Sequence, residues 1–331
     1  MQQPVANAMN MLSQSTIKAI RENLPNLIDA PPVQFDQVND ALRTYFDFYN
    51  FRQCGITTDI EYRIGLLQEE HETLVGHYWT QPRATTTVVV VHGLFDHVGI
   101  YLKLVAELLD HNFAVFAFDM PGHGLSEGRS AVIDSFDDYG RIISGCVKYL
   151  NVITDLPVVA VGQSTGAAGI LRYIFASERL CQFKKVVLLA PLVQPFQWKW
   201  INFSFILLRP FISGVRRKFT VNSNDEEFNA FLLSDPLQPR KVTTPWLAAM
   251  KQWIEQFDTY PNAAIKTLII QGDADTTVDW EINIPRIKRK LPHNKVIMVA
   301  GAQHHLVNEA DHWRHTVFTE TVRFISNLES L

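Results

Sequence analysis

Hydrophobic residues in this chain gather in short runs, many of them β-branched, and longer segments with helical spacing separate the runs. The run 156–161 is too short for a helix, stops at Gly162 and fits a strand that is buried on both faces. Alternation of such runs with helical segments predicts an α/β fold, with a mostly parallel sheet covered by helices on both faces. The predicted strands, eight in all, span 58–64, 73–79, 85–91, 113–118, 156–161, 185–190, 267–271 and 295–299.

The segment ahead of these strands has a different pattern. Residues 1–55 form a predicted helical extension, with helices at 13–24 and 35–49 on either side of Pro31-Pro32. Apolar and aromatic side chains recur along one stripe of the second helix, which favours packing against the main domain over a lid or a dimer contact. The first two strands are expected to pair in antiparallel fashion at one edge of the sheet.

A long insertion interrupts the alternation of strands and helices. About seventy residues after the sixth strand contain no predicted strand and one clear helix, at 245–257. We therefore expect a core built from 56–193 and 263–331, with a helical cap inserted at 194–262. The remaining predicted helices span 98–110, 135–152 and 313–328, and a further one begins just after residue 164.

Composition limits the classes of function. The 331 residues are 47% hydrophobic, and a formal net charge of −4 gives no basic footprint, so nucleic acid is not an expected partner. Cys54, Cys146 and Cys181 lack C-x-x-C spacing, which argues against a disulfide framework or a zinc site and suits a reducing compartment. The N-terminal residues show no signal-peptide pattern, and no uninterrupted apolar run reaches about 18 residues. We expect a cytoplasmic protein that uses no metal and no cofactor.

The first candidate for chemistry is Gly162-Gln163-Ser164-Thr165-Gly166, directly after the run 156–161. It matches G-x-S-x-G, in which a sharp turn from strand to helix holds a serine hydroxyl clear of the backbone. The two glycines fit because a side chain at either position would crowd the turn. The context of strand before and helix after makes Ser164 a candidate nucleophile.

A serine nucleophile needs a general base and a carboxylate that orients the base. His304 and His305 follow the last predicted strand, and catalytic groups of open α/β sheets gather at such carboxyl ends. Asp273, Asp275 and Asp279 follow the preceding strand, and spacing alone does not choose among them. The order serine, aspartate, histidine is the one expected of an α/β-hydrolase.

An oxyanion site is also required, and backbone N–H groups supply it. The N–H after the nucleophile belongs to Thr165, and the loop after the third strand offers the N–H of Leu94 in His92-Gly93-Leu94. Because backbone groups do this work, side-chain identity constrains the assignment only weakly.

The motifs occur in one order along the chain: HG at 92–93, DMPGHGLS at 119–126, GQSTG at 162–166, GDADTTVD at 272–279 and GAQH at 301–304. In this order they resemble the α/β-hydrolases, and within them the monoacylglycerol lipase and lysophospholipase branch that is grouped with serine aminopeptidases of the S33 type. The resemblance covers roughly residues 57–328. It implies Asp275 as the catalytic acid and His304, rather than His305, as the base. Thr165 departs from the methionine usual in this branch, which leaves its N–H unaffected but changes the acyl pocket.

The sequence thus predicts a serine ester hydrolase that forms an acyl-enzyme on Ser164. The resemblance and the apolar cap imply a small-molecule acyl ester as the substrate, a monoacylglycerol or a lysophospholipid. The alternatives are a thioesterase or a small-residue aminopeptidase with the same triad. A non-catalytic binding protein on this fold is disfavoured because no triad residue is missing.

The predicted cap combines a basic run with aromatic residues. The run Arg216-Arg217-Lys218 stands near Trp198, Trp200 and other apolar residues, a combination that would allow peripheral contact with a membrane or micelle. A basic run that is simply solvated is the commoner case. The sequence indicates no oligomeric state.

Overall fold

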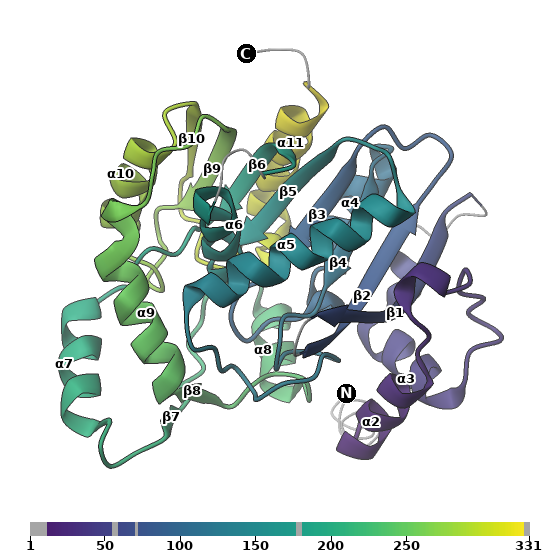
Figure 1. The fold of residues 1–331 in the computed structure, drawn as a ribbon, viewed down its shortest axis with the longest axis horizontal. Coiled ribbons are helices and arrows are strands. Elements are labelled where there is room, and N and C mark those ends of the chain that lie inside the picture. The colour runs from purple at the N-terminus through teal and green to yellow at the C-terminus, as the bar shows by residue number, and fades with distance from the viewer. Residues whose placement is uncertain (1–11, 55–58, 70–71, 177–180, 328–331) are drawn as a thin grey trace.

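The structure is a computed structural model that describes residues 12–54, 59–69, 72–176 and 181–327. Its centre is an eight-stranded sheet with the order β1-β2-β4-β3-β5-β6-β9-β10 (Figure 1). Strand β2 is antiparallel to both of its neighbours, and the other neighbouring pairs are parallel. The predicted α/β fold with a mostly parallel sheet is therefore confirmed. The strands are β1 (Glu61–Glu69), β2 (Glu72–Thr80), β3 (Thr87–Val91), β4 (Ala114–Phe118), β5 (Val158–Gln163), β6 (Phe183–Leu189), β9 (Lys266–Gly272) and β10 (Asn294–Val299).

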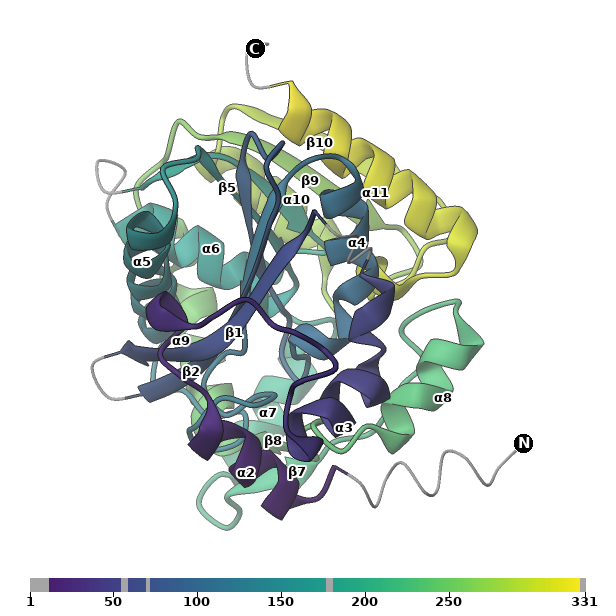
Figure 2. The same ribbon diagram turned by 90° about the vertical axis from the view of Figure 1, so that its right-hand side faces the viewer.

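Two hydrophobic layers enclose this sheet, one on each face. Successive residues of β3 alternate between them, with Val88 and Val90 in one layer and Val89 and Val91 in the other. Helices α4 and α11 contribute to the first layer, and α5, α6 and α10 contribute to the second. Figure 2 shows the helices on both sides of the edge-on sheet. The helices are α4 (Leu102–Asp110), α5 (Phe136–Ile153), α6 (Thr165–Ala176), α10 (Trp280–Lys290) and α11 (Asp311–Ser326).

Helices of the N-terminal extension pack over the same layer as α4 and α11, whereas Leu27 and Ala30 between them belong to the other layer. Helix α2 (Gln14–Asn23) begins after Ser13, whose hydroxyl accepts a hydrogen bond from the N–H of Thr16. Helix α3 (Asp40–Tyr49) buries the aromatic stripe noted in the sequence. The prediction that this helix begins at residue 35 is wrong, because the Asn39 side chain caps the Leu42 N–H and starts the helix there.

Other predicted boundaries also need correction. The first strand runs on to Glu69 rather than ending at 64, because its pairing with β2 continues to Glu72. Residue 58, where that strand was predicted to start, lies outside the described residues, as do residues 1–11 and the predicted last helical residue, 328. None of the described helices is long and apolar enough to cross a membrane.

The inserted segment contains helices and, contrary to the prediction, two short strands. Strands β7 (Gly214–Arg216) and β8 (Lys241–Thr243) pair in antiparallel fashion. Each is only three residues long, so neither shows the alternation by which a strand is recognised in sequence. The helices of the insertion are α7 (Trp198–Leu208), α8 (Glu226–Ser234) and α9 (Thr244–Gln256).

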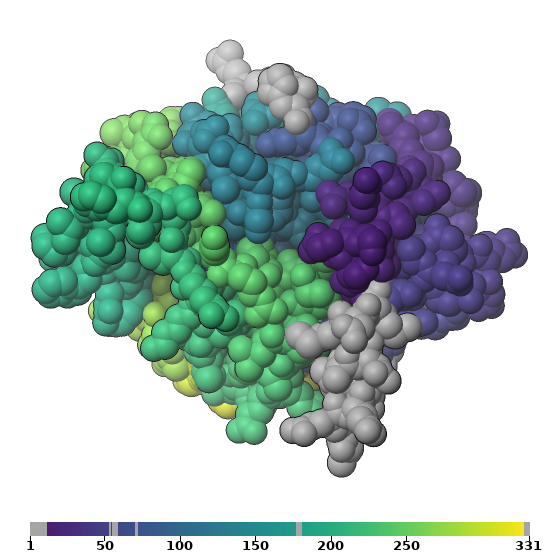
Figure 3. Space-filling view, turned by 90° about the horizontal axis from the view of Figure 1, so that it is seen from below, coloured from purple at the N-terminus to yellow at the C-terminus, as the bar shows by residue number. Residues whose placement is uncertain are grey.

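The inserted segment packs against both hydrophobic layers of the core. Helix α9 packs into the layer of α5 and α6 through Trp246 and Trp253, whereas α8 packs into the opposite layer through Phe228 and Leu232. Viewed from below, the green residues of this segment reach across the face to the purple N-terminal extension (Figure 3). The segment therefore passes across the carboxyl end of the parallel strands.

Candidate active site

Ser164 occupies the sharp turn between β5 and α6. Its φ is 54°, in the left-handed region that L residues rarely adopt. A Cβ on Gly166 would lie 2.2 Å from the carbonyl oxygen of Val91, and one on Gly162 would lie 2.5 Å from Cδ1 of Ile170. Only glycine fits at either side of the serine, because the turn presses its backbone against a neighbouring strand and the following helix.

The structure brings Ser164, His304 and Asp275 together from three separate loops. Nε2 of His304 lies 3.0 Å from Oγ of Ser164, and Nδ1 of His304 lies 2.8 Å from Oδ2 of Asp275. An ionised carboxylate only accepts hydrogen bonds, so Nδ1 carries the proton and donates it, which leaves Nε2 free to accept from the serine hydroxyl. All three side chains are buried.

The carboxylate of Asp275 is held on both of its oxygens. Oδ1 accepts hydrogen bonds from the N–H groups of Thr277 and Val278, and Oδ2 also accepts one from the Gln271 side chain. Burial alone would raise the pKa of Asp275, but His304 and these donors outweigh it and lower the pKa below its ordinary value. Asp275 therefore stays ionised beside the imidazole.

The other two candidate carboxylates are engaged elsewhere. Asp273 accepts a hydrogen bond from the N–H of Gly301. Asp279 accepts one from the Gln194 side chain and stands directly before α10. Of the three carboxylates that the sequence left open, Asp275 is the one in contact with the candidate base.

Burial and the Asp275 carboxylate shift the pKa of His304 in opposite directions. Desolvation lowers the pKa of a buried imidazole, but the Asp275 carboxylate raises it by more, so the pKa of His304 lies above its ordinary value. His305, the alternative base, lies with Nε2 3.3 Å from Oδ2 of Asp96. His92 donates from Nδ1 to the carbonyl of Gly93, and burial lowers its pKa to about 3, so it remains neutral and braces its loop.

The predicted oxyanion donors flank the serine. Thr165 is the first residue of α6, so its N–H has no acceptor within the helix. Leu94 follows Gly93, where an added Cβ would lie 3.5 Å from Cβ of Ser164. The loop of Leu94 is fixed in place because the Tyr101 hydroxyl accepts from the Gly93 N–H and donates to Asp96. Leu94 and Thr165 both line the cavity that contains Ser164 and His304.

This cavity has a volume of about 440 Å³ and two kinds of wall. Apolar side chains from the inserted segment and the loop after β6 form one part, and polar or charged side chains form the other. The apolar part includes Leu192, Pro195, Ile201, Val215, Val242, Trp246 and Leu247, and the polar part includes Asp96, Gln163, Arg217, Lys218, Asn222 and His305, with the ring of Phe95 against Arg217. A ligand with one apolar and one polar end fits this division.

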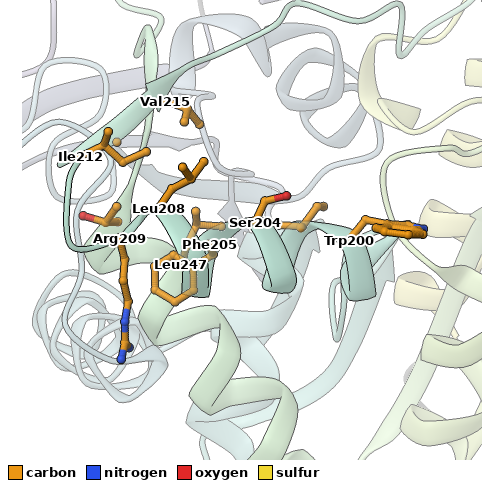
Figure 4. Close-up of a pocket in the computed structure, with 11 residues that line it drawn as sticks. Trp200, Ser204, Phe205, Leu208, Arg209, Ile212, Val215 and Leu247 are labelled. Carbon is orange, nitrogen blue, oxygen red and sulfur yellow. The ribbon is translucent and has the colours of Figure 1, made fainter.

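A second apolar cavity, of about 310 Å³, adjoins the apolar part of the first. The two share Ile201, Val215 and Leu247 as lining residues. In Figure 4 the side chain of Leu208 on α7 points toward Ile212 and Val215. The apolar wall beside Ser164 thus continues outward between α7 and the β7–β8 pair.

Three residues at this site gave no clear signal in the sequence. Gln271 is the last residue but one of β9, and only the fold shows that its side chain donates to Asp275. Asn222 lies in a loop with no motif, and Arg217 is the middle of a basic run whose members look alike. Contacts between distant segments, rather than local pattern, bring these side chains to the cavity.

Comparisons with known proteins agree on the family. The profile described as serine aminopeptidase, S33, matches residues 81–320. A putative non-heme chloroperoxidase from Synechocystis sp. is 25% identical over 270 residues, which are 75% of this chain and 93% of that protein. Human monoglyceride lipase is 28% identical over 277 residues, which are 79% of this chain and 89% of that protein.

A solved structure shows the same fold. The crystal structure of a soluble variant of monoglyceride lipase from Saccharomyces cerevisiae, in complex with a substrate analog, superposes with a TM-score of 0.70. The superposition covers 83% of this chain and 98% of that chain at 18% sequence identity, so it shows a shared fold alone. The chain belongs to the serine aminopeptidase S33 family of α/β-hydrolases and is a serine hydrolase of the branch that includes the monoglyceride lipases.

Proposed function

We propose that this protein hydrolyses an acyl ester of a lipid, with Ser164 as nucleophile, His304 as general base and Asp275 as the carboxylate that orients His304. The observation that carries the proposal is the continuous contact from Ser164 through His304 to Asp275 at the floor of a largely apolar cavity. Each hydrogen bond lies within the distance that proton transfer requires.

The chemical steps follow from this geometry. Oγ of Ser164 attacks the ester carbonyl carbon as its proton moves to Nε2 of His304, and the imidazolium is stabilised by Asp275. The N–H groups of Leu94 and Thr165 stabilise the oxyanion of the tetrahedral intermediate. His304 then protonates the departing alcohol, which leaves an acyl-enzyme on Ser164. Water attacks that ester, again with His304 as base, and releases the fatty acid and free serine.

The apolar wall supports a fatty acyl chain on the acid side of the ester. From Ser164 it runs along Trp246 and Leu247 into the second cavity between α7 and the β7–β8 pair. A monoglyceride lipase among the relatives supports the same substrate class. We therefore propose a monoacylglycerol or a lysophospholipid as substrate, and a small-molecule ester in either case.

The outer face of α7 supports peripheral contact of the protein with a lipid surface. Trp200 and Phe203 are 72% and 62% exposed, Leu207 is exposed as well, and Phe211, just after the helix, is 83% exposed. Contiguous apolar surface of this kind is uncommon on a protein that meets only water. Since α7 also borders the second cavity, docking there would place that cavity near the lipid.

A probe experiment tests the reaction class. A fluorophosphonate should label the wild-type protein but not Ser164→Ala, and p-nitrophenyl esters should be hydrolysed faster as the acyl chain lengthens from acetyl to octanoyl. Labelling or turnover that survives Ser164→Ala would refute the hydrolase mechanism. A preference for acetyl would refute the lipid substrate alone, and faster turnover of acyl thioesters or aminoacyl p-nitroanilides would favour the thioesterase or aminopeptidase alternatives.

A further inference from the structure

Arg217 brings a positive charge to the wall of the cavity that contains Ser164. Its guanidinium lies over the ring of Phe95, 4.2 Å from the centroid. It also lies 4.5 Å from the ring centroid of Phe219, two residues further along the chain. Phe95 directly follows Leu94, the proposed oxyanion donor. The guanidinium therefore lies beside the loop that faces the reacting carbonyl.

This guanidinium is only partly satisfied by the protein. Arginine has five N–H donors, and within the described residues the side chain of Arg217 donates to one acceptor, Oε1 of Gln238. No carboxylate of the described chain lies within ion-pair distance of it. Partial burial lowers its pKa to about 10, which leaves it cationic at neutral pH, and the nearby charge of Asp96 favours that state. A half-buried cation with unused donors in a substrate cavity is suited to an anionic ligand.

The surroundings of Arg217 carry the same sign of charge. Arg216 and Lys241 stand directly opposite each other in the β7–β8 register, an arrangement of like charges that destabilises a strand pair. Arg240 lies over the ring of Phe219 that also contacts Arg217. Lys218 lines the cavity itself. None of these cations pairs with a carboxylate in the part of the chain that the structure describes.

Unsatisfied polar atoms lie on the same side of the cavity. Oδ1 of Asn222 and Nδ1 of His305 are buried without a hydrogen-bond partner in the described chain, whereas Nε2 of His305 lies 3.3 Å from Oδ2 of Asp96. The two residues are adjacent, because the His305 N–H donates to the Asn222 carbonyl. Such atoms are costly to bury unless a ligand completes their hydrogen bonds.

The one carboxylate on this wall does not cancel the basic character. Asp96 accepts a hydrogen bond from the Tyr101 hydroxyl and lies beside His305. The same wall carries two positive charges, those of Arg217 and Lys218. The polar part of the cavity therefore has a net positive charge when its histidines are neutral.

We infer that this polar part is an anion-binding subsite, centred on Arg217, which receives a phosphate on the alcohol side of the lipid ester. The inference rests on the proposed function and narrows it from lipid esters in general to those with a phosphate-bearing head group. The acyl chain occupies the apolar part of the cavity, and the phosphate lies against Arg217, with Lys218, Asn222 and His305 around it. The ester carbonyl then lies between the two parts, at Ser164.

The test compares two substrates that differ by one group, 1-oleoylglycerol and 1-oleoylglycerol 3-phosphate, in mixed micelles of a neutral detergent at equal mole fraction. Wild type should show the higher kcat/KM for the phosphate lipid. In Arg217→Gln, kcat/KM for that lipid should fall about ten- to a hundredfold, the scale of one charge-assisted hydrogen bond in a desolvated site. The loss for 1-oleoylglycerol should be much smaller, so that the preference for the phosphate lipid falls.

Lys251→Gln provides the matched control, because Lys251 is a cation of the inserted segment that pairs with Glu255 outside the cavity. It should leave both substrates unaffected. Arg217→Lys keeps the charge but loses the planar fork, so it should recover part of the loss. If Arg217→Gln does not fold, inhibition of wild type decides instead: glycerol 3-phosphate should compete with a p-nitrophenyl ester, and glycerol should not.

The outcomes separate this inference from the proposed function. Equal losses on both lipids in Arg217→Gln, a wild-type preference for 1-oleoylglycerol, or no inhibition by glycerol 3-phosphate would each overturn the phosphate subsite while ester hydrolysis stands. Inhibition by inorganic phosphate as strong as that by glycerol 3-phosphate would show a site for free phosphate and overturn the assignment to a head group. Turnover of neutral esters that survives Ser164→Ala would refute the proposed function itself.

Discussion

The hydroxyl of Tyr49 donates a hydrogen bond of 2.6 Å to Oδ1 of Asp235, a contact that joins the N-terminal extension to the inserted segment. Oδ2 of the same carboxylate lies 2.8 Å from Nε2 of His97, which follows the loop of Leu94. All three side chains are buried. Burial lowers the pKa of His97, but Asp235 raises it by more, so the pKa lies above its ordinary value. Extension, core and inserted segment thus meet at one carboxylate beside the proposed oxyanion loop.

Removing the Tyr49 hydroxyl should destabilise the whole fold. Tyr49→Phe leaves a buried carboxylate short of one donor, so the free energy of unfolding should fall by about 1.5–3 kcal/mol, as measured by urea denaturation. Tyr149→Phe is the control, because that hydroxyl bonds to the backbone of Gln68 at an exposed position. An effect of Tyr49→Phe no larger than that of the control would show that the contact contributes little.

Asp275→Asn should nearly abolish turnover while leaving the fold intact. An amide no longer fixes the imidazole in the tautomer whose Nε2 accepts from Ser164, a change that lowers kcat about 10⁴-fold in a serine triad. Asp273→Asn and Asp279→Asn should have much smaller effects, since those carboxylates bond to Gly301 and Gln194. A larger loss at either of them would refute the assignment of the acid.

The value of kcat/KM should follow the fraction of His304 that is neutral, because only the neutral imidazole can accept the proton of Ser164. Because Asp275 raises the pKa of His304 above its ordinary value, activity should rise with pH to a midpoint above about 6.5, the value of a free imidazole. In Asp275→Asn the residual activity should have its midpoint at lower pH, because the carboxylate that raised the pKa is gone. A wild-type midpoint below that of the variant would contradict the assignment of His304 as base.

Gly166→Ala should destabilise the turn that holds Ser164. The new Cβ would lie 2.2 Å from a backbone carbonyl of β3, which cannot move without disturbing the sheet. We expect a loss of about 1–3 kcal/mol or more in unfolding free energy, together with loss of esterase activity. Gly169→Ala is the control one turn further along α6, where the nearest atom is a flexible Ile143 methyl at 3.0 Å. Similar effects at the two positions would contradict the account of the turn.

Replacing the exposed aromatic residues of α7 should weaken binding to lipid surfaces. Trp200→Ser and Phe203→Ser should each lower partitioning onto neutral phosphatidylcholine vesicles about tenfold or more, since burial of one large apolar side chain contributes about 1.5–3 kcal/mol. Hydrolysis of a water-soluble p-nitrophenyl ester should change little. Val152→Ser, an exposed apolar residue on α5, serves as control. Unchanged vesicle binding in both α7 variants would refute the docking face.

The chemistry of the site was largely predictable because its parts are local. The turn at Ser164 is encoded by two glycines within five residues, and the carboxyl ends of parallel strands meet at one edge of the sheet. For that reason, Asp275 after β9 and His304 after β10 could be expected beside the serine. The choice of Asp275 among three carboxylates came from the family pattern. In the structure, Asp275 is the one of the three whose carboxylate contacts Nδ1 of His304.

The inserted segment was much less predictable. Strands β7 and β8 are three residues long and far apart in the sequence, so their pairing depends on the segments between them rather than on a local pattern. The insertion that we expected as a helical cap at 194–262 packs against both layers of the core, with α8 in one and α9 in the other. Helix α8 packs through Phe231 on Phe48 and Tyr49 of the extension, partners that lie far away in the sequence.

By itself, the sequence determined the alternation of strands and helices, the turn at Ser164 and the order of the groups that act with it, because periodicity and glycine constraints operate over a few residues. The tertiary structure decided which side chains share the cavity. Arg216, Arg217 and Lys218 look alike in a row, yet it is the guanidinium of Arg217 that stacks on Phe95 beside the serine. Tyr49 and Asp235 are 186 residues apart and meet only because the chain folds the extension and the inserted segment onto the same face.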